Sequence, residues 1–250
     1  MKNILLVNDD GYYAEGLQRL KAKLFPYGNI YTVAPMGAMS AKSVSITVDK
    51  KPLRYEKIDD FNYVVDGTPA DCVDFAVKNL GVTIDYVVSG CNKGLNTSVL
   101  SIWSGTLGAC IEGAYHFLPT IAFSSCINNL EMIDEYAPLV MDYILGYNLL
   151  SNNHILSVNF PYSRVAKGIR LSRLSYNKGK LAFNKEDGNL YVDKHNGIDF
   201  DETDSDLYHT SHGYISICPL STSFYNDKTF NSVKGKFKEV DFKEKEIEIK

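Results

Sequence analysis

Short runs of apolar residues alternate with amphipathic stretches along the first part of the chain. Ile4–Val7 is the first run, and four apolar residues in succession are typical of a strand buried on both faces. Glu15–Phe25 follows with leucines at helical spacing, and Pro26 with Gly28 ends that pattern. The order predicts a strand, a polar loop and a helix.

The same alternation continues to about residue 150. Further elements are predicted in this order: strands at 30–34, 86–88 and 119–123, and helices at 69–80, 104–117 and 131–145. Thr68 before Pro69 is a typical helix start. Segments 46–48 and 53–55 are predicted to pair as a hairpin. Strands that alternate with helices indicate a parallel α/β sheet with right-handed crossovers.

From Ile155 onward strand patterns dominate and helix signals are few. Strands are predicted at 155–160, 168–174, 180–183, 190–192 and 213–218, with a hairpin around residues 186–189. The tail from Lys234 to Lys250 alternates apolar with charged residues, so an edge strand and a solvated arm both remain open. We therefore predict an α/β core at residues 1–150 and a β-rich part at residues 151–250 that completes the core.

Polar residues follow two of the predicted strands where each strand ends. Asn8, Asp9, Asp10 and Gly11 come after the first strand, and a second polar loop with Asn92 follows residues 86–88. Adjacent aspartates converge on one point only where the strand has ended and the chain turns. Carboxylate and amide oxygens suit a divalent cation such as Mg or Mn. The alternative is an Asp-Gly turn with one aspartate capping the next helix.

A serine-rich loop and a helix start add further candidates. Ser40, Ser43 and Ser45 offer hydroxyl ligands, although an isolated loop serine is more often a turn or cap residue. Ser104-Gly105-Thr106 begins a predicted helix, where unpaired backbone N–H groups and the helix dipole attract an anion. A simple N-cap is the alternative there.

Composition narrows the class of protein. The 250 residues are 45% hydrophobic and 22% charged, as in globular proteins. A net charge of -4 gives no general attraction to nucleic acids, so no stable nucleic-acid complex is expected. Five widely spaced cysteines suggest neither a disulfide framework nor a zinc motif. The sequence has no Gly-x-Gly-x-x-Gly motif, which counts against a dinucleotide fold of the dehydrogenase type, and no P-loop motif. Because it shows neither a signal sequence nor a membrane span, we expect a cytoplasmic protein with no membrane partner.

Seven ordered blocks carry a resemblance to a known family: Ile4–Gly11 with Gly16; Val33–Pro35 with Ser40, Ser43, Ser45 and Thr47; Gly67–Val73; Val87–Asn92 with Gly94 and Asn96; Ser104–Thr106 with Glu112 and Gly113; Thr203-Asp204; and Gly213–Leu220. Over nearly its whole length the chain resembles the SurE survival-protein nucleotidases, which are metal-dependent phosphatases of nucleoside monophosphates.

The resemblance implies a Rossmann-like three-layer parallel sheet with a C-terminal β-rich extension that is often exchanged between subunits. A homodimer or homotetramer is therefore expected. It also implies a site with two parts: one divalent metal ion, Mg or Mn, on Asp9, Asp10, Ser40 and Asn92, and phosphate on Asn96, Ser104, Gly105 and Thr106. Asp9 and Asp10 would be the catalytic residues, and which of them accepts a proton stays open. The implied reaction is hydrolysis of nucleoside 5'-monophosphates, with 3'-monophosphates open, by metal-activated water.

Three departures from the family pattern concern the mouth of the site. Met36–Met39 stands where relatives carry charged residues, Ala41 replaces a glycine, and Thr97–Leu100 replaces a Leu-Gly-Asp-Asp run. Base preference therefore stays open, as does an alternative class, a nucleotide-binding sensor or assembly protein with lost or weak turnover. An aspartyl-phosphate mechanism is the rival route, but haloacid-dehalogenase phosphatases use Asp-x-Asp and the acids here are adjacent.

Overall fold

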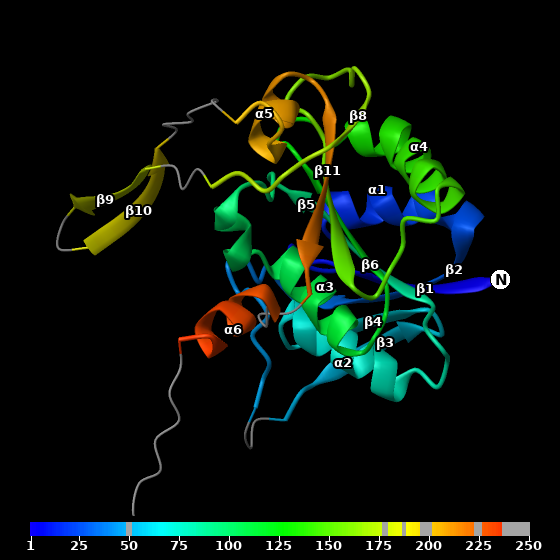
Figure 1. The fold of residues 1–250 in the computed structure, drawn as a ribbon. Coiled ribbons are helices and arrows are strands. Elements are labelled where there is room, and N and C mark those ends of the chain that lie inside the picture. The colour runs from blue at the N-terminus through cyan, green and yellow to red at the C-terminus, as the bar shows by residue number, and fades with distance from the viewer. Residues whose placement is uncertain (49–51, 177–179, 187–188, 196–201, 223–226, 237–250) are drawn as a thin grey trace, which may run out of the picture.

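A computed structural model describes residues 1–48, 52–176, 180–186, 189–195, 202–222 and 227–236 (Figure 1). Its main sheet has nine strands: β1 (Lys2–Val7), β2 (Gly28–Pro35), β3 (Tyr55–Asp59), β4 (Asn62–Val65), β5 (Tyr86–Lys93), β6 (Thr120–Ser125), β7 (His154–Asn159), β8 (Ile169–Leu171) and β11 (Ile215–Ser221). Their order in space is β3-β4-β2-β1-β5-β6-β7-β11-β8. Strands β2, β1, β5, β6 and β7 run parallel, which brings their carboxyl ends to one edge.

Helices cover both faces of this sheet (Figure 1). On one face α1 (Glu15–Leu24) packs beside α4 (Met132–Gly146), and on the other α2 (Pro69–Asn79) packs beside α3 (Gly105–Tyr115). Because β1 lies between these layers, Ile4–Val7 is wholly buried, and its side chains contribute alternately to the two hydrophobic cores. The predicted three-layer α/β arrangement is confirmed.

The segment between β2 and β4 differs from the prediction. Residues 46–48 form no strand, because the Thr47 backbone N–H and hydroxyl donate to the two oxygens of Asp71, at 2.8 and 2.6 Å. The hairpin forms further along, where β3 pairs antiparallel with β4. The predicted pairing of 46–48 with 53–55 is therefore wrong.

In the C-terminal part, β7, β11 and β8 join the main sheet, and β9 (Lys180–Glu186) pairs antiparallel with β10 (Asn189–His195) as the predicted hairpin. Four further elements are short: the 3-10 helices η1 (Phe25–Tyr27) and η2 (Val99–Trp103), and the helices α5 (Asp206–Ser211) and α6 (Asp227–Lys234). Sequence patterns missed both α5 and α6. Residues 187–188, in the predicted turn, and most of the tail, 237–250, lie outside the described residues.

Candidate active site

The loop after β1 meets the end of β5 at the carboxyl edge of the sheet. The Lys93 backbone N–H donates to Asp10 Oδ2 at 3.0 Å, which ties the two polar loops together. Within the first loop, Asn8 Nδ2 donates to the Gly11 carbonyl at 2.8 Å. Gly11 has φ of +99°, a conformation that favours glycine, so the turn depends on this residue. The polar loops that follow β1 and β5 therefore meet in the structure.

Asp9 is the buried acid of the pair, with 4% of its surface exposed. Its Oδ1 accepts a hydrogen bond of 2.7 Å from the hydroxyl of Thr106 at the start of α3. Burial raises the pKa of Asp9 to about 6; the bond from Thr106 acts in the opposite direction, and the charge of Asp10 raises it further. A buried carboxylate beside a second one lacks compensating positive charge, which a bound cation would provide.

The serine-rich loop reaches the same place through its backbone. The Met39 N–H donates to the Asp9 carbonyl at 2.7 Å, so Ser40 directly follows a residue bonded to the aspartate loop, and its side chain is exposed. Ser43 lies elsewhere, since its hydroxyl donates to the Ile102 carbonyl at 2.8 Å. Of the two, Ser40 is the candidate that the structure leaves beside Asp9.

Two asparagines come from the segment at and after the end of β5. Asn92 donates its side-chain amide nitrogen to the Gly94 carbonyl at 2.8 Å, a bond that does not use the oxygen a metal would require. Asn96 donates its backbone N–H to Asn159 Oδ1 at 2.8 Å and its side-chain amide to Ser124 Oγ at 2.9 Å. The sequence analysis did not single out Asn159 or Ser124. Both lie at the carboxyl end of a strand of the sheet, and a search for polar residues at such positions would have found them.

The start of α3 lies against Asp9. Ser104 is the N-cap, because its hydroxyl accepts a hydrogen bond from the Leu107 N–H at 3.2 Å. A side chain at Gly105 would not fit, since its Cβ would lie 2.8 Å from Asp9 Cβ and 3.0 Å from Asp9 Oδ2. The cap leaves the first backbone N–H groups of the helix as donors beside the carboxylate loop.

The residues present fit a hard divalent cation. Asp9, Asp10, Asn92 and Ser40 are an all-oxygen donor set carried by three converging segments. Asn8 Oδ1 is also fully buried at this loop without a hydrogen-bond partner among the described residues. Oxygen donors with two carboxylates favour Mg or Mn over softer metals.

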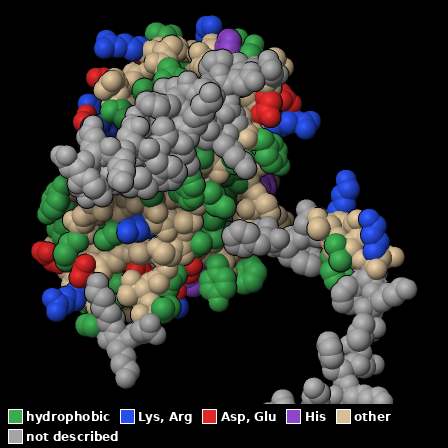
Figure 2. Space-filling model, turned by 90° about the vertical axis from the view of Figure 1, so that its left-hand side faces the viewer, with side chains coloured by type: hydrophobic (Ala, Val, Ile, Leu, Met, Phe, Trp, Pro, Cys, Tyr) green, Lys and Arg blue, Asp and Glu red, His purple; other side chains and the backbone are tan. Residues whose placement is uncertain are grey.

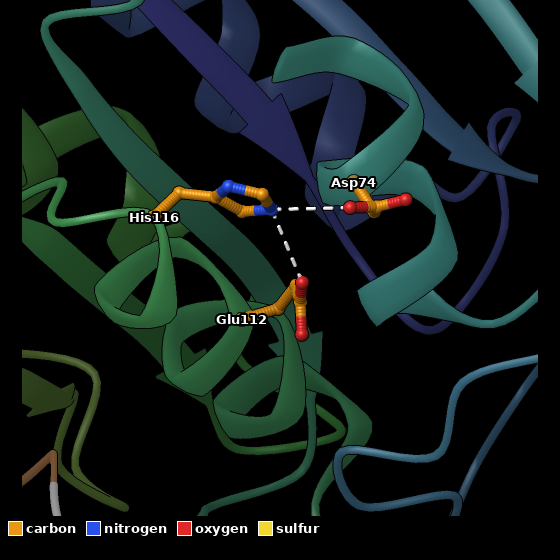
Figure 3. Close-up of side chains that lie close together, drawn as sticks. All are labelled: Asp74, Glu112 and His116. Carbon is orange, nitrogen blue, oxygen red and sulfur yellow. Dashed lines mark hydrogen bonds and ion pairs between the residues drawn. The ribbon is translucent and has the colours of Figure 1, made fainter. Parts of the chain in front are cut away.

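A separate acidic cluster lies at the opposite end of α3 (Figure 3). His116 Nε2 is 3.1 Å from Asp74 Oδ1 and 3.2 Å from Glu112 Oε1, and Lys78 Nζ is 2.5 Å from the same Asp74 oxygen. These groups already pair with one another across α2 and α3. The network therefore joins the two helices, and the candidate active site begins at the other end of α3 with Gly105.

The fold and the oxygen-rich edge define an α/β protein with a candidate site for a cation and an anion at the carboxyl ends of parallel strands. The family model for survival protein SurE matches residues 4–180. The chain is 37% identical over 229 residues to the 5'-nucleotidase SurE of Actinobacillus succinogenes, with 87% of this chain and 92% of the relative covered. It is 33% identical over 250 residues to the 5'-nucleotidase SurE of Clostridium botulinum, with 94% and 99% covered.

A solved structure gives the same result. The crystal structure of SurE protein from Aquifex aeolicus matches with a TM-score of 0.81 and 30% sequence identity, over 93% of this chain and 98% of that one. The chain belongs to the SurE family.

In the part of the chain that the structure describes, no helix is both long and apolar enough to span a bilayer.

Proposed function

We propose that the protein is a metal-dependent nucleotidase that hydrolyses nucleoside 5'-monophosphates to nucleoside and phosphate, with the action on 3'-monophosphates left open. Relatives named 5'-nucleotidase SurE over most of the chain support this activity. The observation that carries the proposal is the contact between Asp9 and the start of α3, through Thr106 and Gly105. This contact places the carboxylates, which would bind a cation, next to the backbone N–H groups at the start of the helix, which would bind an anion.

The proposed metal ligands are Asp9, Asp10, Ser40 and Asn92, with one Mg or Mn ion as the proposed cofactor. When bound, the ion would supply polarisation of a phosphoryl oxygen and a lower pKa for a coordinated water. Bringing positive charge to Asp9 would also offset the burial that raises the pKa of this carboxyl group.

The other residues bind and orient the phosphate. We propose that the backbone N–H groups of Gly105 and Thr106 stabilise charge on the phosphoryl oxygens, as preorganised donors at a helix start do. Ser104 fixes these donors through its cap. Asn96 is held by bonds to the ends of β6 and β7, so its side-chain amide is a further, rigidly held contact for the phosphate. Asp9 and Asp10 are the candidate acceptors of the proton that the attacking water loses.

We propose a homodimer or homotetramer, with the C-terminal part in the interface. Figure 2 shows hydrophobic side chains on the side of the molecule from which β9 and β10 extend in Figure 1. Exposed residues such as Ile102, Trp103, Tyr176 and Val233 belong to η2, the approach to the hairpin and α6. Exposed apolar side chains that gather in a contiguous patch are typical of contact surfaces. Light scattering on purified protein tests the number of subunits. A cytoplasmic location stays a prediction from the sequence.

The decisive experiment is phosphate release from a panel of 5'- and 3'-nucleoside monophosphates with Mg or Mn, beside EDTA and an Asp10→Asn variant. Asp60→Asn is the matched control, because this side chain is 85% exposed in the β3–β4 turn. We expect release that EDTA and Asp10→Asn both abolish and that Asp60→Asn leaves intact. Nucleotide binding without release, by folded protein loaded with metal, would instead indicate a sensor, and a trapped phosphoenzyme would indicate the aspartyl-phosphate route.

A further inference from the structure

A buried carboxylate outside the candidate active site is bonded to the segment that leads into the phosphate-binding helix. Asp206, the first residue of α5, is 1% exposed. Its Oδ2 accepts a hydrogen bond of 2.8 Å from the Ser98 N–H. Its Oδ1 accepts bonds from the N–H groups of Ser175, at 3.0 Å, and Leu207, at 2.8 Å. The carboxylate thus joins residue 98 of the core to two places in the C-terminal part.

Ser98 has a backbone conformation that explains why it needs such a bond. Its φ of +61° and ψ of -179° lie in a region that is essentially restricted to glycine. Ser98 is the N-cap of η2, and Ser104 is both the C-cap of η2 and the N-cap of α3, so no irregular chain separates Ser98 from the phosphate donors. A change in the backbone conformation of Ser98 would therefore shift the start of α3.

A second bond parallels the first. The Val99 N–H donates to the Ser175 carbonyl at 2.9 Å, so two successive amides of the 98–104 segment are held by the C-terminal part. At the other end of the segment, the Trp103 and Ile102 carbonyls accept bonds from Ser43. Hydrogen bonds thus hold the 98–104 segment to the C-terminal part at one end and to the serine-rich loop at the other.

We propose that Asp206 is a positioning residue of the phosphate site: it holds Ser98 in its strained conformation and so fixes where α3 presents its backbone donors. This rests on the proposed function, in which the start of α3 binds phosphate. Asp206 itself touches neither substrate nor metal. The C-terminal part thereby contributes to phosphate affinity without supplying a ligand.

The test measures the affinity for inorganic phosphate, by calorimetry in the presence of Mn, together with the affinity for Mn by electron paramagnetic resonance. In Asp206→Asn one carboxylate oxygen becomes an amide N–H₂ group, which cannot accept a hydrogen bond from a backbone N–H. We expect phosphate affinity to fall about tenfold, as for the loss of one hydrogen bond to a charged group. We expect Mn affinity to change by less than about twofold, because no proposed metal ligand contacts Asp206.

The rescue variant separates positioning from general stability. Glycine adopts the conformation of residue 98 without strain, so Ser98→Gly added to Asp206→Asn should restore phosphate affinity to within about threefold of the wild type. The matched control is Ser205→Ala, which removes the N-cap bond of 3.1 Å to the Tyr208 N–H in the same helix. It destabilises α5 without touching residue 98 and should leave phosphate affinity unchanged.

If Asp206→Asn does not fold, Asp206→Glu decides the question. It keeps the carboxylate but places it one methylene group further from its backbone, so that it cannot accept the bond from the Ser98 N–H in the same position. Phosphate affinity that stays at the wild-type value in the folded variant overturns the proposal, as does an equal loss in Ser205→Ala. Wild-type protein that binds no phosphate and hydrolyses no nucleotide overturns the proposed function instead.

Discussion

The contact between α3 and the serine-rich loop permits a sharp test through Gly108→Ala. A Cβ at Gly108 would lie 1.8 Å from the Ser43 carbonyl oxygen and 2.4 Å from its carbon. Close C···O contacts in proteins are about 3.3 Å, so either α3 or the loop must move by more than about 1 Å. Both segments carry proposed site residues. The change therefore lowers both stability and activity.

The matched control for this variant is Gly146→Ala. Gly146 is the last residue of α4, and nothing lies within 4 Å of a Cβ added there. Both variants replace glycine by alanine in a helix, and the gain in helix propensity of about 1 kcal/mol is common to them. The difference between their free energies of unfolding therefore isolates the steric effect. Overpacking against a rigid backbone costs about 3 kcal/mol.

Urea unfolding followed by circular dichroism measures both free energies, and phosphate release measures the activity of each variant. We expect Gly108→Ala to unfold at lower urea, with a free energy of unfolding about 3 kcal/mol below that of Gly146→Ala. We also expect its phosphate release to fall while that of the control does not. Equal midpoints and equal activities would refute the close packing of α3 on the serine-rich loop.

Three further predictions concern other sites. Thr106→Val removes the hydroxyl that donates to Asp9 and should weaken Mn binding about tenfold, measured by electron paramagnetic resonance. His116→Ala removes the partner that lowers the pKa of Glu112, which burial raises above its usual 4.5. When the pKa of an acid is higher in the folded than in the unfolded protein, the folded protein becomes less stable as the pH rises above the unfolded pKa. The free energy of unfolding of the variant should therefore fall more steeply above pH 4.5 than that of the wild type. Under native conditions a thiol reagent should label Cys126 alone, because the other four cysteines are buried.

Controls sharpen these outcomes. Thr32→Val makes the same chemical change as Thr106→Val at a buried hydroxyl without a hydrogen-bond partner among the described residues, and should leave Mn binding unchanged. An equal loss in both variants would contradict the role of Thr106. For the histidine, parallel pH profiles of variant and wild type would show that the network does not control Glu112. Fast labelling of more than one cysteine would contradict their burial, which raises the pKa of Cys72, for example, well above the usual value.

The sequence by itself determined the local elements of the core and the segments that carry the site. Buried strands such as Ile4–Val7 and the capped start of α2 at Thr68 follow from patterns within a few residues, since apolar runs and N-caps act locally. The polar loops after β1 and β5 were visible for the same reason. Their meeting was predictable because parallel strands place their carboxyl ends at one edge.

Only the tertiary structure decided which side chains hold those loops. Asp71 draws Thr47 away from the predicted hairpin, and Asn159 fixes Asn96 from a strand that is distant in the sequence. The sequence blocks singled out Thr203-Asp204, yet the structure leaves Asp204 exposed and buries Asp206 against residue 98. A hydrogen bond between such distant residues depends on how the layers pack, and no pattern within a few residues encodes that packing.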